Sequence, residues 1–383
     1  MMKSVSTRLC HSVSPARIGA LMRFGFTQRQ AQFLVHVLVF SGVFLERQYR
    51  MFTGLAHGQK TQDFLAKLVT AGYATPITPG ALHRGRLYHV QYKPLYEAIG
   101  EPNNRHRKAA SLGRFVERLM LLDAVLVDRR YGWLGTEQDK RTYFREALEK
   151  DLPDDWYPHL TFGTGEQKTT RFFPDKLPIG VPLKDDWRHV FLYLATREVP
   201  TDFRVFLLRH SDLLTSVDEW TVRVLLPRRF RKAAALYRYA VRDAFLMPLT
   251  PRDTEELDWY FRARRGEVVC PAQDPDLDLA TAARRFSAAR FEAAYRMWQE
   301  RDVQALWALQ SPTLRDHLQR GQGRVEFAEL PHQSLQLTPL VGVPGGVEKG
   351  LMEETTYQPR RLSSAISLIS PAHHLVTSAF RAP

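Results

Sequence analysis

The feature that most constrains the fold is a run of helix signals and chain breaks between residues 27 and 100. Thr27-Gln28-Arg29-Gln30 has the form of a capping box, in which the Thr hydroxyl accepts from the N3 amide and the Gln side chain returns to the Thr backbone. Apolar residues at 31, 34, 35 and 38 follow at the spacing of one helical face. We therefore predict a helix that begins after Thr27 and ends before Ser41-Gly42.

The rest of this stretch predicts two more helices and a pair of strands. The expected elements are helices over 45–52 and 59–71, strands over 73–77 and 86–90, and a closing helix that begins near Pro94. Phe64 lies on the apolar face of the 59–71 helix, and Gly72 suits a left-handed C-cap at its end. Three helices followed by two strands are typical of a winged helix-turn-helix, which we predict over residues 15–100.

Polar residues of this segment form the candidate DNA-binding set. In a winged helix the third helix enters the major groove, where amide, hydroxyl and ammonium groups contact base edges and phosphates. The loop between the two strands would be the wing. The candidates are Arg29 on the first helix, Gln59, Lys60, Thr61, Gln62 and Lys67 off the apolar stripe of the third, and His83, Arg84 and Arg86 in the wing. Winged helices also dock proteins, so an adaptor is an alternative.

The distribution of charge favours a polyanionic partner. The chain carries a net charge of +13. Residues 1–110 hold 15 Lys plus Arg against 4 Asp plus Glu, a balance of +11, whereas the remaining 39 basic and 37 acidic residues give +2. A positive field confined to the predicted winged helix indicates double-stranded DNA.

The same sequence argues against several other classes. Cys10 and Cys270 are the only cysteines, which argues against a disulfide framework and a Cys-rich zinc site. No apolar run approaches 18 residues, and the N-terminus lacks a secretory signal, so we expect a cytoplasmic protein without a membrane contact.

Composition shifts divide the chain further. The predicted segments are a flexible N-terminus (1–14), the winged helix (15–100), an exposed basic linker (101–111), an α/β domain (112–247), a helical C-terminal region (248–320) and a flexible tail (321–383). In the α/β domain, a helix over 112–127 precedes a second helix from Thr136. Strands are expected over 157–162, 171–173 and 190–195, followed by a helix over 202–214, a strand over 221–226 and a helix over 229–245. The fold class is therefore α+β, with a small mixed sheet at the centre.

The α-β-β-β-α-β order around Phe173-Pro174-Asp175 resembles the PD-(D/E)xK nuclease core. A winged helix joined to such a core, with Trp133, Pro174-Asp175 and Phe206-Leu207 in that order, resembles the replication-relaxation proteins of plasmids and other mobile elements. The resemblance covers roughly residues 20–247, and it implies a DNA-binding regulatory or accessory role in transcription, replication or transfer control.

The residues that a working nuclease needs are incomplete. Such a site holds Mg²⁺ with Asp175, a carboxylate on the third strand and often a Glu from the first helix, for which Glu137 or Glu146 is available. The third strand, Val190-Phe191-Leu192-Tyr193-Leu194-Ala195, has neither an acid nor a Lys, and Pro200 stands two residues after Glu198. We therefore favour a degenerate, non-catalytic core without a cofactor, and keep a Mg²⁺-dependent nuclease as the alternative. A homodimer and a protein partner of the C-terminal region remain open.

Overall fold

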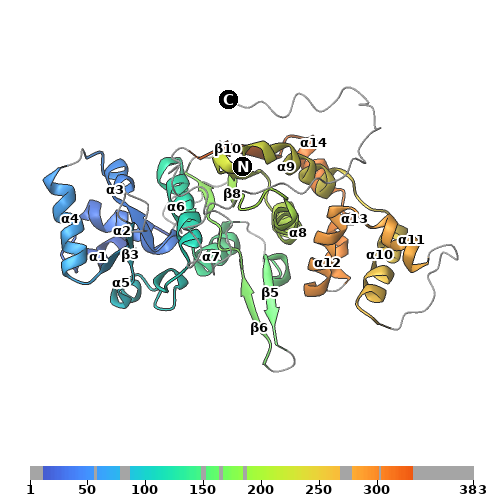
Figure 1. The fold of residues 1–383 in the computed structure, drawn as a ribbon, viewed down its shortest axis with the longest axis horizontal. Coiled ribbons are helices and arrows are strands. Elements are labelled where there is room, and N and C mark those ends of the chain that lie inside the picture. The colour runs from blue at the N-terminus through green and yellow to red at the C-terminus, as the bar shows by residue number, and fades with distance from the viewer. Residues whose placement is uncertain are drawn as a thin grey trace, which may run out of the picture.

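The protein has a mixed α+β architecture with three small sheets in the part described. The computed structural model describes residues 12–55, 58–77, 87–147, 152–163, 167–183, 188–267, 278–301 and 303–330. Figure 1 shows the N-terminal helices at one end of an elongated molecule, helices α10–α13 at the other end, and the central sheet with α6–α8 between them. The predicted N-terminal residues 1–11 and the predicted wing, with His83, Arg84 and Arg86, lie outside the described residues.

The N-terminal elements follow the predicted order closely, with one additional strand. They are α1 (Pro15–Met22), α2 (Gln28–Phe40), β1 (Val43–Leu45), α3 (Glu46–Thr53), α4 (Gln59–Thr70), β2 (Ala74–Ile77), β3 (Leu87–Val90) and α5 (Lys93–Ala98). The strands form an antiparallel sheet in the order β1-β3-β2. Strand β1 was not expected, because three residues between two helices carry no alternation that a sequence pattern can detect.

Local signals and aromatic packing hold these helices in place. The capping box of α2 is present, with the Thr27 hydroxyl accepting from the Gln30 amide at 3.3 Å and the Gln30 side chain accepting from the Thr27 amide at 3.0 Å. Phe64 of α4 stacks on Tyr49 of α3, with ring centroids 4.1 Å apart, and Phe33 of α2 contacts the same pair. The apolar side of α4 is therefore fixed, and its opposite side is left to solvent.

The central domain is built on a five-stranded mixed sheet. Its elements are α6 (Leu112–Val127), β4 (Tyr131–Leu134), α7 (Glu137–Ala147), η2 (Asp154–Trp156), β5 (His159–Phe162), β6 (Thr169–Phe172), β7 (Ile179–Pro182), β8 (His189–Leu194), α8 (Thr201–Ser216) and β9 (Trp220–Leu226). The strand order is β10-β9-β8-β7-β4, in which β4, β7 and β8 pair antiparallel and β8, β9 and β10 pair parallel.

Two of the predicted strands do not belong to this sheet. Strands β5 and β6, expected as the first and second strands of the core, form a separate antiparallel hairpin that projects from the molecule (Figure 1). Their places are taken by β4 and β7, which the sequence pattern missed. Both are short and contain glycine, and Gly180 of β7 lies opposite Trp133 of β4. A Cβ at Gly180 would lie 3.0 Å from the Trp133 ring, so this pairing needs a residue that carries no strand signal.

The C-terminal part is helical, with more breaks than predicted. It contains η4 (Arg228–Ala233), α9 (Ala234–Val241), the π-helical η5 (Arg242–Leu246), α10 (Pro251–Arg264), α11 (Leu279–Arg285), α12 (Ala289–Arg301), α13 (Gln304–Gln310), α14 (Thr313–Gln319) and β10 (Gly323–Glu329). The single helix expected over 229–245 is thus three helical segments. Within the predicted helical region, α11 ends before Phe286, whose ring packs against Tyr260 with centroids 5.7 Å apart.

The expectation that the tail begins at residue 321 is wrong. Residues 323–329 form β10, which pairs parallel with all seven residues of β9. Val325 and Leu330 are buried, and Gly323 lies so close to the Trp220 ring that a Cβ there would collide with it. The glycine at position 323 is therefore required by the close approach of β10 to Trp220. The rest of the predicted tail, 331–383, lies outside the described residues.

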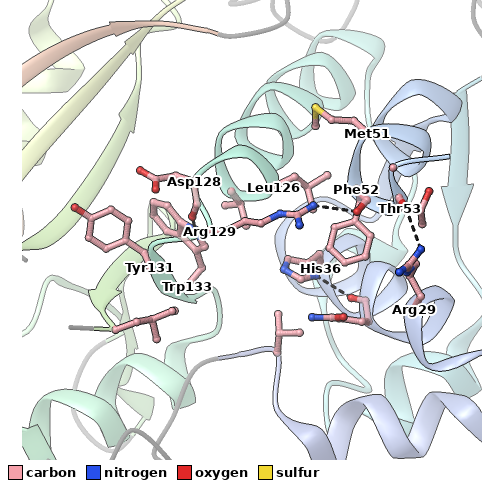
Figure 2. Close-up of a pocket in the computed structure, with 16 residues that line it drawn as sticks. Arg29, His36, Met51, Phe52, Thr53, Leu126, Asp128, Arg129, Tyr131 and Trp133 are labelled. Atoms are coloured by element: carbon pink, nitrogen blue, oxygen red, sulfur yellow. Dashed lines mark hydrogen bonds between the residues drawn. The ribbon is translucent and has the colours of Figure 1, made fainter. Parts of the chain in front are cut away.

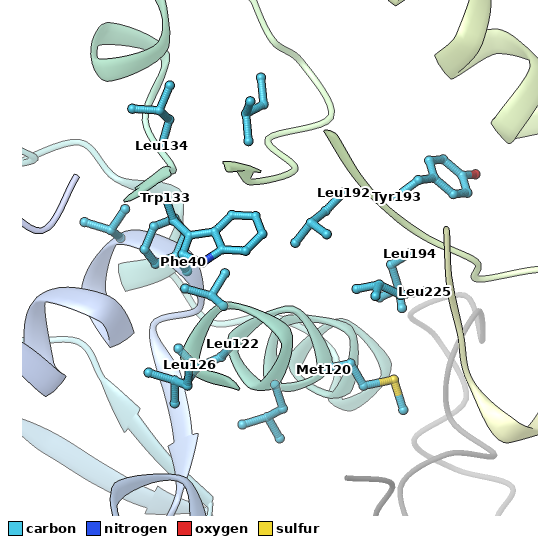
Figure 3. Packing of buried hydrophobic residues seen from close by; sticks show 14 of the residues in the cluster. Phe40, Met120, Leu122, Leu126, Trp133, Leu134, Leu192, Tyr193, Leu194 and Leu225 are labelled. Carbon is cyan, nitrogen blue, oxygen red and sulfur yellow. The ribbon is translucent and has the colours of Figure 1, made fainter. Parts of the chain in front are cut away.

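The N-terminal module and the central domain share one hydrophobic core. Buried residues of α2 and β1 join those of α6, β4 and the sheet in a single cluster, while α10–α13 pack on α8 in a second one. Figure 3 shows Phe40, Leu122, Leu126 and Trp133 at this junction. Gly135 lies so close to Val39 and Phe40 that a Cβ would collide with them. The two parts are therefore packed together as closely as a domain interior.

The stretch predicted as an exposed linker takes part in this packing. Residues 105–107 form the short helix η1 (Arg105–Arg107), and His106 is buried. Its backbone carbonyl oxygen lies 3.0 Å from Nε2 of His89 on β3, and its side chain covers Gly42. The prediction that this stretch is exposed is wrong for His106. Contacts with β1 and β3 bury its side chain, and no local sequence pattern reveals these contacts.

Candidate nucleic-acid interface

The exposed side of α4 carries three of the predicted DNA-contacting side chains. Gln59, Lys60 and Gln62 are all exposed, and the first turn of the helix contains no carboxylate. The Gln59 amide donates to the Asp63 carboxylate at 2.6 Å. The hydrogen bond between Gln59 and Asp63 must break before the Gln59 amide can contact a base. Among the described residues, Lys60 and Gln62 have no such side-chain hydrogen bond to break.

Thr61 does not belong to this surface, and its prediction is corrected. The side chain is completely buried, and its hydroxyl has no hydrogen-bond partner among the described residues. Thr61 precedes Phe64 by three positions and Leu65 by four, so it shares their apolar helix face. A Thr at this position packs against the core and is out of reach of a nucleic acid.

Lys67 and Arg29 each have a local structural partner. The Lys67 ammonium donates to the Gly25 carbonyl and lies 4.8 Å from the centre of the Phe26 ring, so it holds the turn between α1 and α2 against α4. Arg29 donates to the Thr53 carbonyl at 3.1 Å, where its charge suits the C-terminal end of α3. Both side chains retain some exposure, but their first role is to position helices.

A pocket of about 670 Å³ lies between this module and the central domain. Figure 2 shows Arg29, His36 and Phe52 on one side of it and Arg129 and Trp133 on the other. The Arg129 guanidinium donates to the Phe52 carbonyl at 2.9 Å. Because Arg29 lines this pocket, its side chain lies beside the boundary between the N-terminal module and the central domain.

A second group of polar side chains surrounds Asp175, the residue singled out by the nuclease resemblance. One Asp175 oxygen accepts from the Leu177 amide at 2.9 Å, and the other lies 3.4 Å from Nε2 of the buried His210. Lys140 of α7 is 1% exposed and donates to the Leu177 carbonyl at 2.7 Å. The loop adopts left-handed backbone angles at Phe173 (φ 47°) and at Lys176 (φ 56°), which L-residues rarely adopt.

Burial shifts the pKa values of the two basic side chains beside Asp175, His210 and Lys140. Burial lowers the pKa of His210 to about 4 although Asp175 opposes the shift, so the imidazole is neutral at pH 7. Its Nδ1 lies 2.9 Å from the Phe206 carbonyl and therefore carries the proton. Nε2 then presents a lone pair to Asp175, which explains why the two side chains approach without a hydrogen bond. Burial also lowers the pKa of Lys140 to about 8, again against Asp175.

These residues do not fit the magnesium site of the nuclease alternative. Mg²⁺ takes several oxygen ligands, whereas Asp175 faces an imidazole and a buried ammonium. Glu137 and Glu146 are exposed on α7, and all six residues of β8 lack a carboxylate. Within the described segments, no three His, Cys, Asp or Glu side chains are grouped closely enough to hold a metal ion.

Several residues of interest were missed by the sequence patterns. Lys140 stands in a polar helix, and nothing in its neighbourhood signals burial. Arg114 and Arg118 of α6 belong to an amphipathic helix whose charges normally face solvent. Arg105 and Arg107 were noticed only as part of a basic linker. No local pattern shows that, of these four arginines, Arg114 alone forms an ion pair with a described acid.

No protein-family model, no curated protein and no solved structure matches the chain. Among the described residues, no helix combines the length and the apolar character needed to cross a membrane.

Proposed function

We propose that this protein binds double-stranded DNA through an N-terminal winged helix and serves a mobile element as a cytoplasmic, non-catalytic regulatory or accessory factor. The observation that carries the proposal is the exposed, acid-poor start of α4, with Gln59, Lys60 and Gln62, in a segment whose charge balance is +11. The element order α2-β1-α3-α4-β2-β3 with the sheet β1-β3-β2 supports a winged helix in which α4 is the recognition helix.

The central domain supports the resemblance to a degenerate nuclease core. Its elements α6, β4, β7, β8, α8 and β9 follow the α-β-β-β-α-β order, with α7 and the β5–β6 hairpin inserted after the first strand. The acids and Lys of a nuclease are missing from β8. Purified protein is expected to leave plasmid DNA intact with Mg²⁺ or Mn²⁺; cleavage that Asp175→Ala abolishes would establish the nuclease alternative.

Salt-dependent binding of the full chain to a short duplex tests the DNA proposal. If four to six basic residues meet phosphates, the slope of log K against log salt is about −4 to −5. Lys60→Gln should weaken binding to every sequence and make the slope shallower by about 0.9. Gln62→Ala should instead reduce discrimination between sites by roughly 1–3 kcal/mol where a bidentate contact is lost.

Arg324→Gln is the matched control for charge. Arg324 is an exposed residue of β10, so this variant loses the same charge as Lys60→Gln without touching α4. It should bind like the wild type. If both variants lose the same DNA affinity, the effect of Lys60→Gln comes from net charge and not from the position of Lys60 on α4. If the protein shows no salt-dependent binding to any duplex, the protein-docking adaptor becomes the favoured function.

A further inference from the structure

Four arginines stand on η1 and the first half of α6, and three of them, Arg105, Arg114 and Arg118, lie close enough to interact electrostatically. Arg105 and Arg107 come from η1, and Arg114 and Arg118 lie one helical turn apart on α6. Arg114 pairs with Glu117 at 2.8 Å. Among the residues that the structure describes, the other three arginines form no ion pair and no side-chain hydrogen bond. Elsewhere the arginines of this chain commonly meet an acid, as Arg47, Arg204 and Arg209 do.

Several of the nitrogen atoms at this place are buried and unpartnered. Nε of Arg107, Nη1 of Arg118 and Nδ1 of His106 have no hydrogen-bond partner in the described part of the chain. His106 is 6% exposed and lies between the two η1 arginines. Buried polar atoms without a partner are costly in free energy, and folded proteins normally satisfy them. Arg118 lies close enough to Arg105 and His106 to interact electrostatically with both, so an acceptor group placed here would meet more than one donor.

The electrostatics of the group point to the same missing partner. Burial, followed by repulsion from Arg105, lowers the pKa of Arg118 to about 10. Burial and repulsion from Arg114 likewise lower the pKa of Arg105. The first turn of α6 contains no acid, so the positive end of that helix adds to the field. Asp175 and Glu117 oppose the lowering of the Arg105 pKa, and Glu117 opposes that of the Arg118 pKa, but neither shift is reversed. The positive charge at this place is therefore partly desolvated and only partly compensated.

We propose that η1 and the first half of α6 form a binding site for a phosphate group, held by the guanidinium groups of Arg105 and Arg118. A phosphate offers several acceptor oxygens to several donors at once, and the planar guanidinium matches its geometry. The phosphate belongs either to a nucleic-acid backbone or to a free phosphate or nucleotide. This site extends beyond the α4 surface, because Arg118 belongs to the central domain.

Titration of the full chain with inorganic phosphate tests the site without any DNA. In a low-salt buffer, calorimetry should show saturable binding to the wild type. Arg105→Gln and Arg118→Gln should each weaken it by about tenfold or more, the effect of losing one hydrogen bond to a charged group. Arg118→Lys keeps the charge but loses the planar fork, so its loss should be intermediate. Arg324→Gln, outside the cluster, should bind as the wild type does.

Urea unfolding of each variant separates loss of the site from loss of the fold. The Arg105 side chain is largely open to solvent, although its guanidinium is partly desolvated, and it forms no ion pair with a described residue. Arg105→Gln should therefore unfold at the wild-type urea concentration while it loses phosphate affinity. Wild-type protein that binds no phosphate at tens of millimolar, or variants that bind it as the wild type does, would overturn the proposal.

Binding of a 20-base-pair duplex identifies the source of the phosphate. If Arg118→Gln lowers the salt slope by about one, the site holds a backbone phosphate. If phosphate affinity is lost while duplex binding and its slope are unchanged, the site holds a free phosphate or nucleotide. Either result supports the site. Because the phosphate titration needs no DNA, failure of the α4 proposal and failure of this one are distinguishable.

Discussion

Asp123 connects the N-terminal module to the central domain, and its removal should destabilise the protein substantially. The carboxylate lies on α6 and is 1% exposed. It accepts from the Arg47 guanidinium at 2.8 and 2.6 Å and from the Gln48 amide at 2.9 Å. Gln48 is fully buried, and its other amide hydrogen reaches the Leu119 carbonyl at 2.9 Å. The buried carboxylate of Asp123 and the buried amide of Gln48 are therefore satisfied by partners across the contact between α3 and α6.

The expected loss of stability follows from the groups that Asp123→Ala leaves without a hydrogen-bond partner. Breaking a buried ion pair costs about 3–5 kcal/mol, and one amide hydrogen of Gln48 loses its acceptor. The Arg47 side chain is 35% exposed, so water solvates part of the guanidinium and reduces the loss. We expect the free energy of unfolding to fall by about 3 kcal/mol. Arg47→Met should cost at least as much, because it leaves the carboxylate buried with a single donor.

Equilibrium urea unfolding monitored by tryptophan fluorescence measures these changes as shifts of the midpoint. The control is Asp154→Ala, which removes a pair with Arg141 at 2.9 Å whose acid is 64% exposed and should therefore cost less than about 1 kcal/mol. The double variant Arg47→Met/Asp123→Leu should recover part of the loss, since it leaves no charge buried. An Asp123→Ala variant within 1 kcal/mol of the wild type would refute the reasoning.

Two further predictions concern the central domain. Burial lowers the pKa of Lys140 from 10.5 to about 8, so between those pH values the unfolded chain binds the extra proton. The free energy of unfolding of the wild type should therefore rise, relative to Lys140→Met, by up to about 3 kcal/mol as pH increases from 8 to 10.5. Urea unfolding at pH 7.5, 9 and 10.5 measures this rise, and parallel pH profiles would contradict it. Ending the chain at residue 320 should cost at least about 3 kcal/mol against a chain ending at 330, because burial of Val325 and Leu330 is lost. Both chains lack residues 331–383, so they differ only in residues 321–330, which include β10 and Leu330. Equal free energies of unfolding for the two chains would show that β10 does not stabilise the fold.

The sequence predicted elements well where the signal is local. The capping box of α2 lies where Thr27 indicates it, and α6 spans the expected residues 112–127. These signals involve residues within about four positions of one another, so they survive without tertiary context. The sequence does not predict strands β4 and β7, because both are short and Gly180 of β7 is required by the Trp133 ring on the neighbouring strand. The prediction that Thr61 contacts DNA was wrong, because its spacing to Phe64 places it on the buried face of α4.

The candidate site was predicted in part. Gln59, Lys60 and Gln62 are exposed as the helix pattern indicates, and their role in DNA binding stays a prediction. Lys67 and Arg29 have carbonyl partners 42 and 24 positions away, which spacing along one helix cannot reveal.

What the sequence alone determined is where helices begin and end, and that the positive charge is concentrated in the first 110 residues. Both depend on residue identity and short spacing. The tertiary structure decided which strands share a sheet, as when β10 pairs with β9 about a hundred residues earlier, and which charges remain uncompensated. Arg47 meets Asp123 across 76 positions, while Arg105, Arg107 and Arg118 form no ion pair with an acid among the described residues. Pairing over such separations is fixed by the packing of the whole core, because the free energy of a buried charge depends on every group that surrounds it.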